Sequence, residues 1–266
     1  MKPLSVGNVV SAGLRIYRDN FKKYFKLAFI GYLWIFVPIY GWAKYSAMMG
    51  TIARLAYGEA AEQPETVRDA RRRTNSRKWS FLGAGILVSL VIFGAMIPLA
   101  IGVSLLGALA GFAFDLNSAI GGILGALVVL VAILAFVFGL IWLISRLFLV
   151  ELPLAVEERV TASSTIGRSW NLTKGSVGRI QLVVLLGFLI SIPILFVTNV
   201  ASFILQMIIG TGLEQAPGLA ALGSLLYIAL ALAGGALMIP FWQSIKAMVY
   251  YDLRIRREGM GMNLRK

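Results

Sequence analysis

Basic side chains are the residues of this chain whose types and spacing could do chemistry, and residues 67–82 carry their densest run. The stretch VRDARRRTNSRKWSFL holds six Arg and Lys residues and one acid, and it leads into a Trp and a long apolar segment. Such a run can bind the phosphates of nucleic acid or of lipid headgroups, or it can fix the orientation of a membrane protein. Because it adjoins an apolar segment and no nucleic-acid fold accompanies it, we expect no nucleic-acid partner.

A set of basic residues in three parts of the chain is therefore predicted to anchor the topology or to contact anionic lipid headgroups. These residues are Lys22, Lys23, Lys26, Arg71, Arg72, Arg73, Arg77, Lys78, Arg168, Lys174 and Arg179. The last three would surround a cytoplasmic mouth if the protein were a carrier. Membrane lipids are the expected partners, with other membrane proteins or a second copy of the chain as further possibilities.

Several chemistries lack the residues that they need. The chain has no Cys and no His, which removes disulfides, thiolate and imidazole catalysis and Cys/His metal sites. Its 12 acids all fall outside or at the edges of the apolar stretches, and no nucleophile elbow or phosphate-binding loop occurs. The sequence predicts no enzyme, no metal and no cofactor.

The composition predicts an integral membrane protein. Hydrophobic residues make up 59% of the 266 positions and charged residues 14%, far from the balance of a soluble domain. Residues 80–114, 116–145, 180–213 and 215–244 contain no ionisable side chain apart from Tyr. Each is longer than the ~20 residues that cross a bilayer as a helix.

The 25 basic residues fall into blocks that alternate with these apolar stretches, and this alternation predicts the topology. By the positive-inside rule the blocks are cytoplasmic, so residues 79–145 and 180–245 form two hairpins whose turns lie outside, and both termini are cytoplasmic. The two hairpins resemble each other at an offset of about 100 positions, as tandem copies would.

Residues 27–58 lie between two basic blocks that are both expected on the cytoplasmic side, so this segment must cross the membrane an even number of times. It is too short for two full membrane spans. We expect a short or re-entrant hairpin that turns at Pro38 and Gly41, is sheltered by the longer hairpins, and places Lys44 near the outer headgroups or in a wet pocket.

Helices lying in the headgroup plane should precede the membrane segments. Residues 1–26 show apolar positions at helical spacing with basic flanks, a second helix can start near Pro64, and a third can start at Ser163 or Ser164 and stop at Gly175. Residues 59–78 are a basic loop, residues 146–179 a basic segment and residues 246–266 a tail, all cytoplasmic. The whole chain, 1–266, is predicted to be one membrane domain.

Two pairs of glycines suggest close packing of helices near the first outside turn. Gly107 with Gly111, and Gly121 with Gly125, have the small-xxx-small spacing that lets two helices approach each other. Packing within the chain is the expected use, and a homodimer face is the alternative.

Three stretches in order along the chain resemble a known family. LSVGNVVSAGLRIYRDNFKKYFKLAFI, TIGRSWNLTKGSVGRI and YYDLRIRREG resemble bacterial membrane proteins grouped around the glycerophosphoryl diester phosphodiesterase membrane domain and related domains of unknown function. VPIYGWAKYSAMMGTIARLAYGE further resembles a cyanobacterial branch. The resemblance implies a six-helix membrane domain without an assigned reaction, because the soluble phosphodiesterase barrel is absent.

These observations predict an all-α integral membrane bundle of about six membrane helices in three hairpins, with basic interfacial helices on the cytoplasmic side. A bacterial inner membrane or a thylakoid membrane is the expected location. The leading hypothesis is a scaffold or assembly factor among lipids and other membrane proteins. The alternative is a carrier or lipid-handling protein for an amphiphilic anion.

Overall fold

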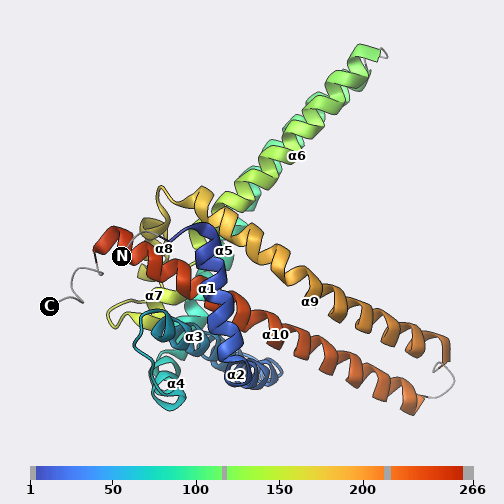
Figure 1. Ribbon diagram of the computed structural model, residues 1–266. Helices are drawn as coiled ribbons and strands as arrows, with labels where there is room; N and C mark the ends of the chain where they lie inside the picture. The colour runs from blue at the N-terminus through green and yellow to red at the C-terminus, as the bar shows by residue number, and fades with distance from the viewer. Residues whose placement is uncertain (1–3, 116–118, 213–216, 260–266) are drawn as a thin grey trace.

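The protein is described by a computed structural model that covers residues 4–115, 119–212 and 217–259. These residues form ten α-helices and no strand, which confirms the predicted all-α class. The helices are α1 (Val6–Asp19), α2 (Phe21–Trp34), α3 (Tyr40–Ala60), α4 (Val67–Ser76), α5 (Lys78–Asp115), α6 (Ala119–Leu147), α7 (Glu151–Val156), α8 (Ser164–Thr173), α9 (Val177–Gly212) and α10 (Pro217–Glu258). Two long pairs, α5–α6 and α9–α10, project from a body that contains the shorter helices (Figure 1).

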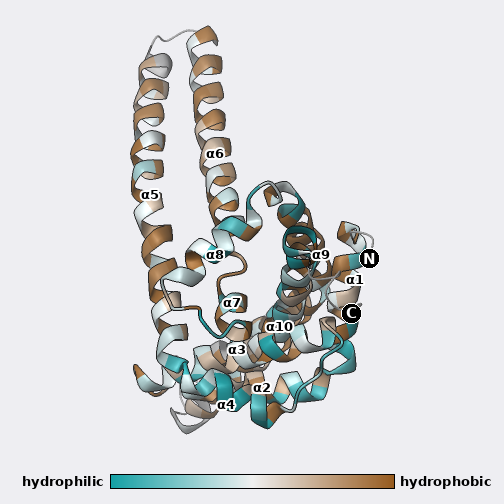
Figure 2. Cartoon of the chain, turned by 90° about the vertical axis from the view of Figure 1, so that its left-hand side faces the viewer, coloured by the Kyte–Doolittle hydropathy of each residue, from teal (hydrophilic) through white to brown (hydrophobic). Residues whose placement is uncertain are grey.

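The projecting helices contain the segments that are long and apolar enough to cross a membrane. Four helical stretches, Lys78–Phe112, Ile120–Val156, Val177–Ile209 and Ala221–Glu258, are long and apolar enough to cross a membrane. At most 22% of the most apolar part of each helix is buried within the protein. Most of the hydrophobic residues of these helices, coloured brown in Figure 2, are therefore not covered by other parts of the chain. Such surface is stable against lipid and not against water, which supports a membrane protein.

The predicted count of about six spans is not confirmed, because the described residues contain four such helices. Helix α2 has only 14 residues, and α3, with 21, carries Lys44, Arg54 and Glu59. Most of α3 is buried: it packs against α10, α2, α4, α5 and α7 and forms the centre of the body. A charged helix that other protein elements cover in this way does not need lipid around it.

The turn between α2 and α3 corrects the prediction for residues 27–58. The chain does turn back near Pro38, where Ile39 has a positive φ of 58°. Residues at the turn are exposed, however, with Phe36 62% and Ile39 61% accessible, so the long hairpins do not shelter them. Lys44 donates a 2.6 Å hydrogen bond to Asn75 at the end of α4, and so lies near the start of α5 and not at the far end of the membrane helices. The basic blocks before and after the turn are thus joined without a long crossing helix.

The three predicted amphipathic segments form helices with shifted boundaries. The first is interrupted at Asn20 and gives α1 and α2 in place of one helix, and Ser5 caps α1 by accepting a hydrogen bond from the Asn8 amide. Thr66, and not Pro64, precedes α4 and caps it. Helix α8 starts at Ser164 and ends before Gly175, whose φ is 72°, as predicted, but Ser163 at its N-cap position makes no side-chain cap hydrogen bond. Their apolar faces pack within the body, with Val9 and Val10 of α1 at 1% and 2% exposure.

The α5–α6 contact uses only one of the two predicted glycine pairs. Gly121 and Gly125 of α6 are buried, whereas Gly107 and Gly111 of α5 have nothing within 4 Å of where a Cβ would be. The less exposed positions of α5 follow one stripe at helical spacing: Ile92, Ala95, Leu99, Val103, Leu106 and Ala110. Gly107 and Gly111 each come one residue after that stripe, about 100° around the helix. Gly107 and Gly111 therefore do not pack against α6, and their alternative use as a homodimer face stays a prediction.

Candidate functional site

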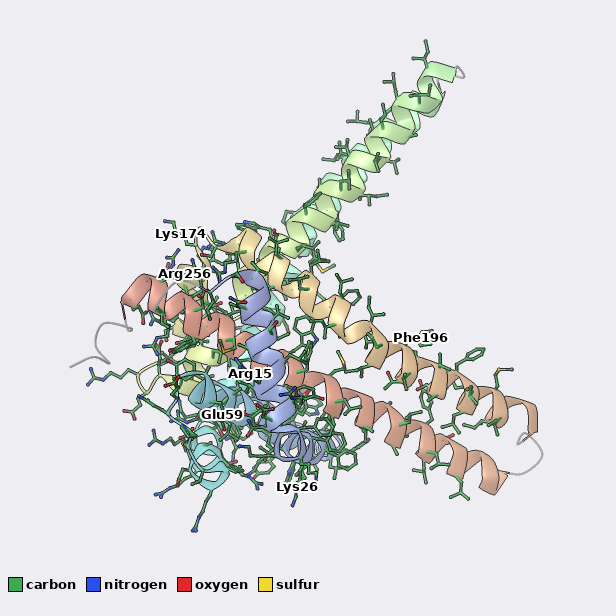
Figure 3. The ribbon with its side chains drawn as sticks, in the orientation of Figure 1. Arg15, Lys26, Glu59, Lys174, Phe196 and Arg256 are labelled. Carbon is green, nitrogen blue, oxygen red and sulfur yellow. The ribbon has the colours of Figure 1, made fainter. Side chains whose placement is uncertain are left out.

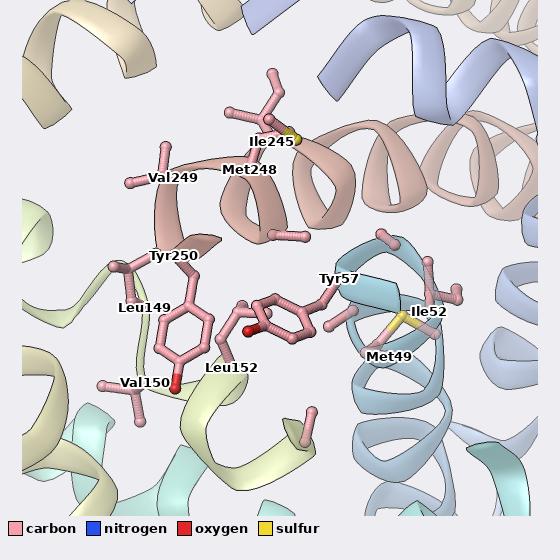
Figure 4. Packing of buried hydrophobic residues seen from close by; sticks show 14 of the residues in the cluster. Met49, Ile52, Tyr57, Leu149, Val150, Leu152, Ile245, Met248, Val249 and Tyr250 are labelled. Atoms are coloured by element: carbon pink, nitrogen blue, oxygen red, sulfur yellow. The ribbon is translucent and has the colours of Figure 1, made fainter. Parts of the chain in front are cut away.

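The two hairpins are joined to the body by an apolar core. Charged residues surround this core and are called the ionic collar: Glu151, Glu157, Arg168, Arg179, Lys246, Asp252, Arg254, Arg256 and Glu258. Figure 4 shows Leu149 and Leu152, from the chain after α6, packed beside Tyr57 of α3 and Tyr250 of α10. Leu149, Leu152 and Tyr250 are all fully buried. Helices that are up to 200 residues apart in the chain therefore share one packed centre.

Glu157 connects three elements of the collar. One of its carboxylate oxygens, Oε1, accepts hydrogen bonds from Arg168 of α8, at 3.0 Å and 2.9 Å, and from the Tyr250 hydroxyl of α10. Arg168 also pairs with Glu258 at the end of α10, and Arg254 pairs with the same carboxylate at 2.9 Å. Burial lowers the pKa of Arg168, but its hydrogen bonds and charge interactions with Glu157 and Glu258 raise it more, so its pKa lies above its ordinary value.

A second ionic group fastens α9 and the start of the chain to α10. Asp252 is 4% exposed and pairs with Arg179 of α9 at 3.0 Å and with Arg256 at 2.8 Å. Both arginines also donate to the carbonyl oxygen of Leu4, just before α1, and the Leu4 amide donates to Asp252 at 3.2 Å. If these contacts were broken, the buried carboxylate of Asp252 would be left without a partner, at a high cost in free energy. The contacts therefore hold α9, α10 and the residues before α1 in fixed relative positions.

A third contact lies nearer the membrane segments. Lys246 of α10 pairs with Glu151 of α7 at 3.0 Å, and Gln243 donates to the same carboxylate at 2.8 Å. Arg146 at the end of α6 lies over the rings of Trp142 and Trp170, 5.3 Å and 4.9 Å from their centroids. A basic side chain therefore lies where each hairpin joins the body: Lys246, held by an acid, in α10, and Arg146, held by aromatic rings, in α6.

Arg77 ties the start of α5 to the segment that follows α7. Its guanidinium donates to the carbonyl oxygens of Leu154 and Glu157 at 2.8 Å and 2.7 Å, and also to that of Val160. Burial, and then the nearby charge of Arg54, lower the pKa of Arg77 from its ordinary value. Carbonyls at the end of a helix are the groups that a guanidinium satisfies well, because it offers five donors in a plane.

The structure separates the predicted headgroup contacts into two kinds. Arg77, Arg168 and Arg179 bind groups of the protein and are not free for headgroups, whereas their role as topology anchors stays a prediction. The ammonium of Lys23 lies 3.6 Å from a carboxylate oxygen of Glu59. The exposed members are Lys22, Lys26, Arg71, Arg72, Arg73 and Lys174. Of these, Arg73 is only 3.9 Å from the exposed Glu158, a contact that contributes little in water.

Lys78 belongs to a cluster of lysines and aromatic rings that the sequence analysis missed. Its ammonium lies 4.6 Å from the centroid of the Tyr40 ring, and that of Lys44 lies 5.8 Å from the same centroid and 5.9 Å from that of Trp34. In the part of the chain that the structure describes, neither lysine lies within ion-pair distance of a carboxylate. Proximity in the sequence could not reveal the cluster, because Tyr40 and Lys78 are far apart along the chain.

A polar groove lies between α9 and α10, away from the body. It has a volume of about 480 Å³, and its polar lining residues are Thr198, Asn199, Ser202, Gln206 and Tyr227. The Asn199 amide and the Thr198 hydroxyl already donate to carbonyls of their own helix.

The polar groove does not continue into the body as a passage between the two helices. Nearer the body α9 and α10 are in direct contact, since a Cβ on Gly187 would lie 3.0 Å from the Trp242 ring. A groove with this closed end could hold a ligand, but it provides no continuous polar path along the hairpin.

No group of three metal-ligating side chains occurs among the described residues. Comparisons of the chain with models of protein families, with curated proteins and with solved structures find no match. The resemblance to the phosphodiesterase membrane domain and the cyanobacterial origin therefore stay predictions.

Proposed function

We propose that the protein is a non-enzymatic membrane scaffold that holds two membrane hairpins apart on a rigid body. In this proposal α5, α6, α9 and α10 each cross the bilayer, and the body with its basic residues lies on the cytoplasmic side of a bacterial inner membrane or a thylakoid membrane. Lipids and a membrane helix of another protein would occupy the space between the hairpins.

The observation that carries the proposal is the divergence of the hairpins. Helices α6 and α9 meet where the hairpins leave the body, and from there the two hairpins point in different directions (Figure 1). Phe196 of α9 is 67% exposed and points away from α10, on the side of the other hairpin (Figure 3). The apolar surface that faces the space between the hairpins is left uncovered by the protein's own helices, so it is available to lipid or to a membrane helix of another protein.

Helix length makes this shape compatible with a bilayer. The uncharged parts of these helices, residues 79–114, 119–145, 180–212 and 217–245, are about 40 to 54 Å long, whereas the hydrocarbon layer is about 30 Å thick. Helices that exceed the bilayer thickness accommodate it by tilting, so both hairpins can cross while they lean in different directions. The ionic collar supports the angle between them, because its pairs join α10 to α9 and to α8, and Arg146 of α6 donates a 3.1 Å hydrogen bond to the carbonyl oxygen of Trp170 in α8.

Site-specific crosslinking in native membranes tests the proposal. A photoreactive amino acid at Phe196 should form adducts with another membrane protein. The same group at Leu226 on α10, the helix of this hairpin farther from α5–α6, should form fewer such adducts or only lipid adducts. Lipid adducts alone at both positions would refute the scaffold.

The groove between α9 and α10 favours a second candidate, a carrier or lipid-handling protein for an amphiphilic anion. Its amide and hydroxyl groups could hold a polar head while the apolar walls hold a chain. If this function holds, N199L/Q206L should reduce transfer of a fluorescent anionic lipid across proteoliposome membranes. Unchanged transfer in that variant would exclude the carrier, and a scaffold would keep its Phe196 adducts in the same variant.

A further inference from the structure

An exposed apolar tip lies between α2 and α3, outside the four candidate spans. Its exposed side chains are Leu33 at 49%, Phe36 at 62%, Val37 at 43%, Ile39 at 61%, Tyr40 at 41% and Trp42 at 47%. The tip belongs to the body between the labels α2 and α3 (Figure 2), and outside it and the four candidate spans the described residues expose only two large apolar side chains above 36%, Leu14 at 37% and Phe21 at 38%. A contiguous patch of this kind on a polar body marks a contact with a membrane or a partner.

The lysine–aromatic cluster of Lys44, Lys78, Tyr40 and Trp34 lies at the base of this tip. Both ammonium groups are held near the Tyr40 ring, and the described residues provide no carboxylate for either. Two like charges that share an aromatic site repel each other, and an anion between or beside them removes that cost. The charge of the site therefore complements an anion and not another basic or neutral helix.

The position of the cluster along the membrane normal follows from α5. Lys78 is the first residue of α5 and of the first candidate span, so it marks the boundary where that helix enters the apolar layer. Trp79 beside it is 53% exposed, as is usual for an aromatic residue at the headgroup level. The lysines thus lie at the height of lipid phosphates, next to a tip that can enter the acyl region.

We propose that the tip enters the leaflet and that Lys44 and Lys78 bind the phosphate of an anionic phospholipid whose acyl chains pack on Phe36 and Ile39. The two ammonium groups interact with the phosphate charge, and Tyr40 and Trp34 hold the lysines near it. The site does not depend on the scaffold role, since it requires only that α5 crosses the membrane.

Lipid retention by the purified full-length protein tests the site. Native mass spectrometry in a neutral detergent would compare phosphatidylglycerol with phosphatidylcholine. The wild type should retain phosphatidylglycerol preferentially, and K44Q/K78Q should bind it about tenfold more weakly. The control R68Q/R159Q removes the same charge from two exposed arginines that lie outside the predicted headgroup contacts, and it should change binding little.

Two further variants separate recognition of the lipid from a change in folding. K44R/K78R keeps both charges and should keep the preference for phosphatidylglycerol, whereas F36S/I39S should weaken retention of the lipid with both lysines intact. Inorganic phosphate at millimolar concentration should not compete, because it lacks acyl chains. Equal binding by K44Q/K78Q and wild type, an equal loss in R68Q/R159Q, or a loss in K44R/K78R as large as in K44Q/K78Q would each overturn the proposal.

Discussion

At the scale of single residues, the basic side chains divide according to whether the body surrounds them. Arg77 and Arg168 are enclosed and use their planar donors on carbonyls and carboxylates, while Arg71 and Arg72, a few residues before Arg77, face outward. A guanidinium can bind several acceptors at fixed angles, whereas a lysine cannot, so these two groups of arginines should respond differently to substitution.

Arg77→Lys should lower stability by about 2 kcal/mol, because one ammonium cannot reach the three carbonyl oxygens that the guanidinium satisfies. The matched exposed control, Arg72→Lys, should be close to neutral. Thermal unfolding of the purified protein in detergent measures both. Equal melting temperatures for the two variants would contradict the internal role of Arg77.

Glu157→Gln should weaken the contact between α8 and α10. Arg168 and the buried Tyr250 hydroxyl would then donate to a neutral amide oxygen in place of a charged carboxylate. We expect the melting temperature to fall and amide exchange in α8 to increase, with little change in α5. The exposed Glu158→Gln is the control. Unchanged exchange in α8 would show that this ionic contact does not fasten the element.

At the scale of elements, contacts across the body decide which faces of the helices are covered. Helices α2 and α3 have the length and composition of a short hairpin, but α3 is covered by protein and α2 ends at an exposed turn. Gly41 allows this turn, because a Cβ there would lie 1.9 Å from the carbonyl oxygen of Trp34.

Gly41→Ala should therefore disturb the turn at a cost of roughly 1–3 kcal/mol, the range for overpacking a tight contact. Gly85→Ala in α5 is the control, because nothing lies within 4 Å of its Cβ and Ala favours a helix. Thermal unfolding should show a loss for the first and no loss for the second. If phosphatidylglycerol binding is also measured, Gly41→Ala should reduce it. A Gly41→Ala protein as stable as the wild type would mean that the turn is not constrained in this way.

At the scale of the whole molecule, the body and the two hairpins have opposite surface chemistry. The hairpins expose Leu, Ile, Val and Phe along most of their length, while Lys and Arg gather on the body (Figures 2 and 3). A bilayer separates such surfaces, because charge at its centre costs several kcal/mol and apolar side chains prefer the hydrocarbon.

Single cysteines test this orientation in a chain that has no native Cys. Cysteines at Ser76 and Ser163 on the body should be labelled by an impermeant reagent from the same side, and one at Phe112 near the far end of α5 from the opposite side. A cysteine at Phe36 should be protected in membranes and reactive in detergent. Labelling of Ser76 and Ser163 from opposite sides would rule out the two-hairpin topology.

The sequence by itself determined the class of the protein and its apolar segments. Long stretches without charge form helices whatever lies beside them, because lipid requires the backbone to satisfy its own hydrogen bonds. The caps near Ser5 and Thr66 are equally local. For the same reason the four long helices cover the four uncharged stretches of the sequence, although α10 continues past the last of them to Glu258.

Only the tertiary structure decided which basic residues are free, which glycines touch a helix and where residues 27–58 go. Arg77 needs carbonyls that lie about 80 positions later, and Tyr40 meets Lys78 only because α3 and α5 pack together. A spacing of four residues shows that two glycines lie on the same face of a helix, but it does not show which way that face points. The rotation of the packed helices decides that Gly125 is buried and Gly111 is exposed. Burial, helix rotation and contacts between distant segments are properties of the packed chain, so a pattern of residue types limits them without fixing them.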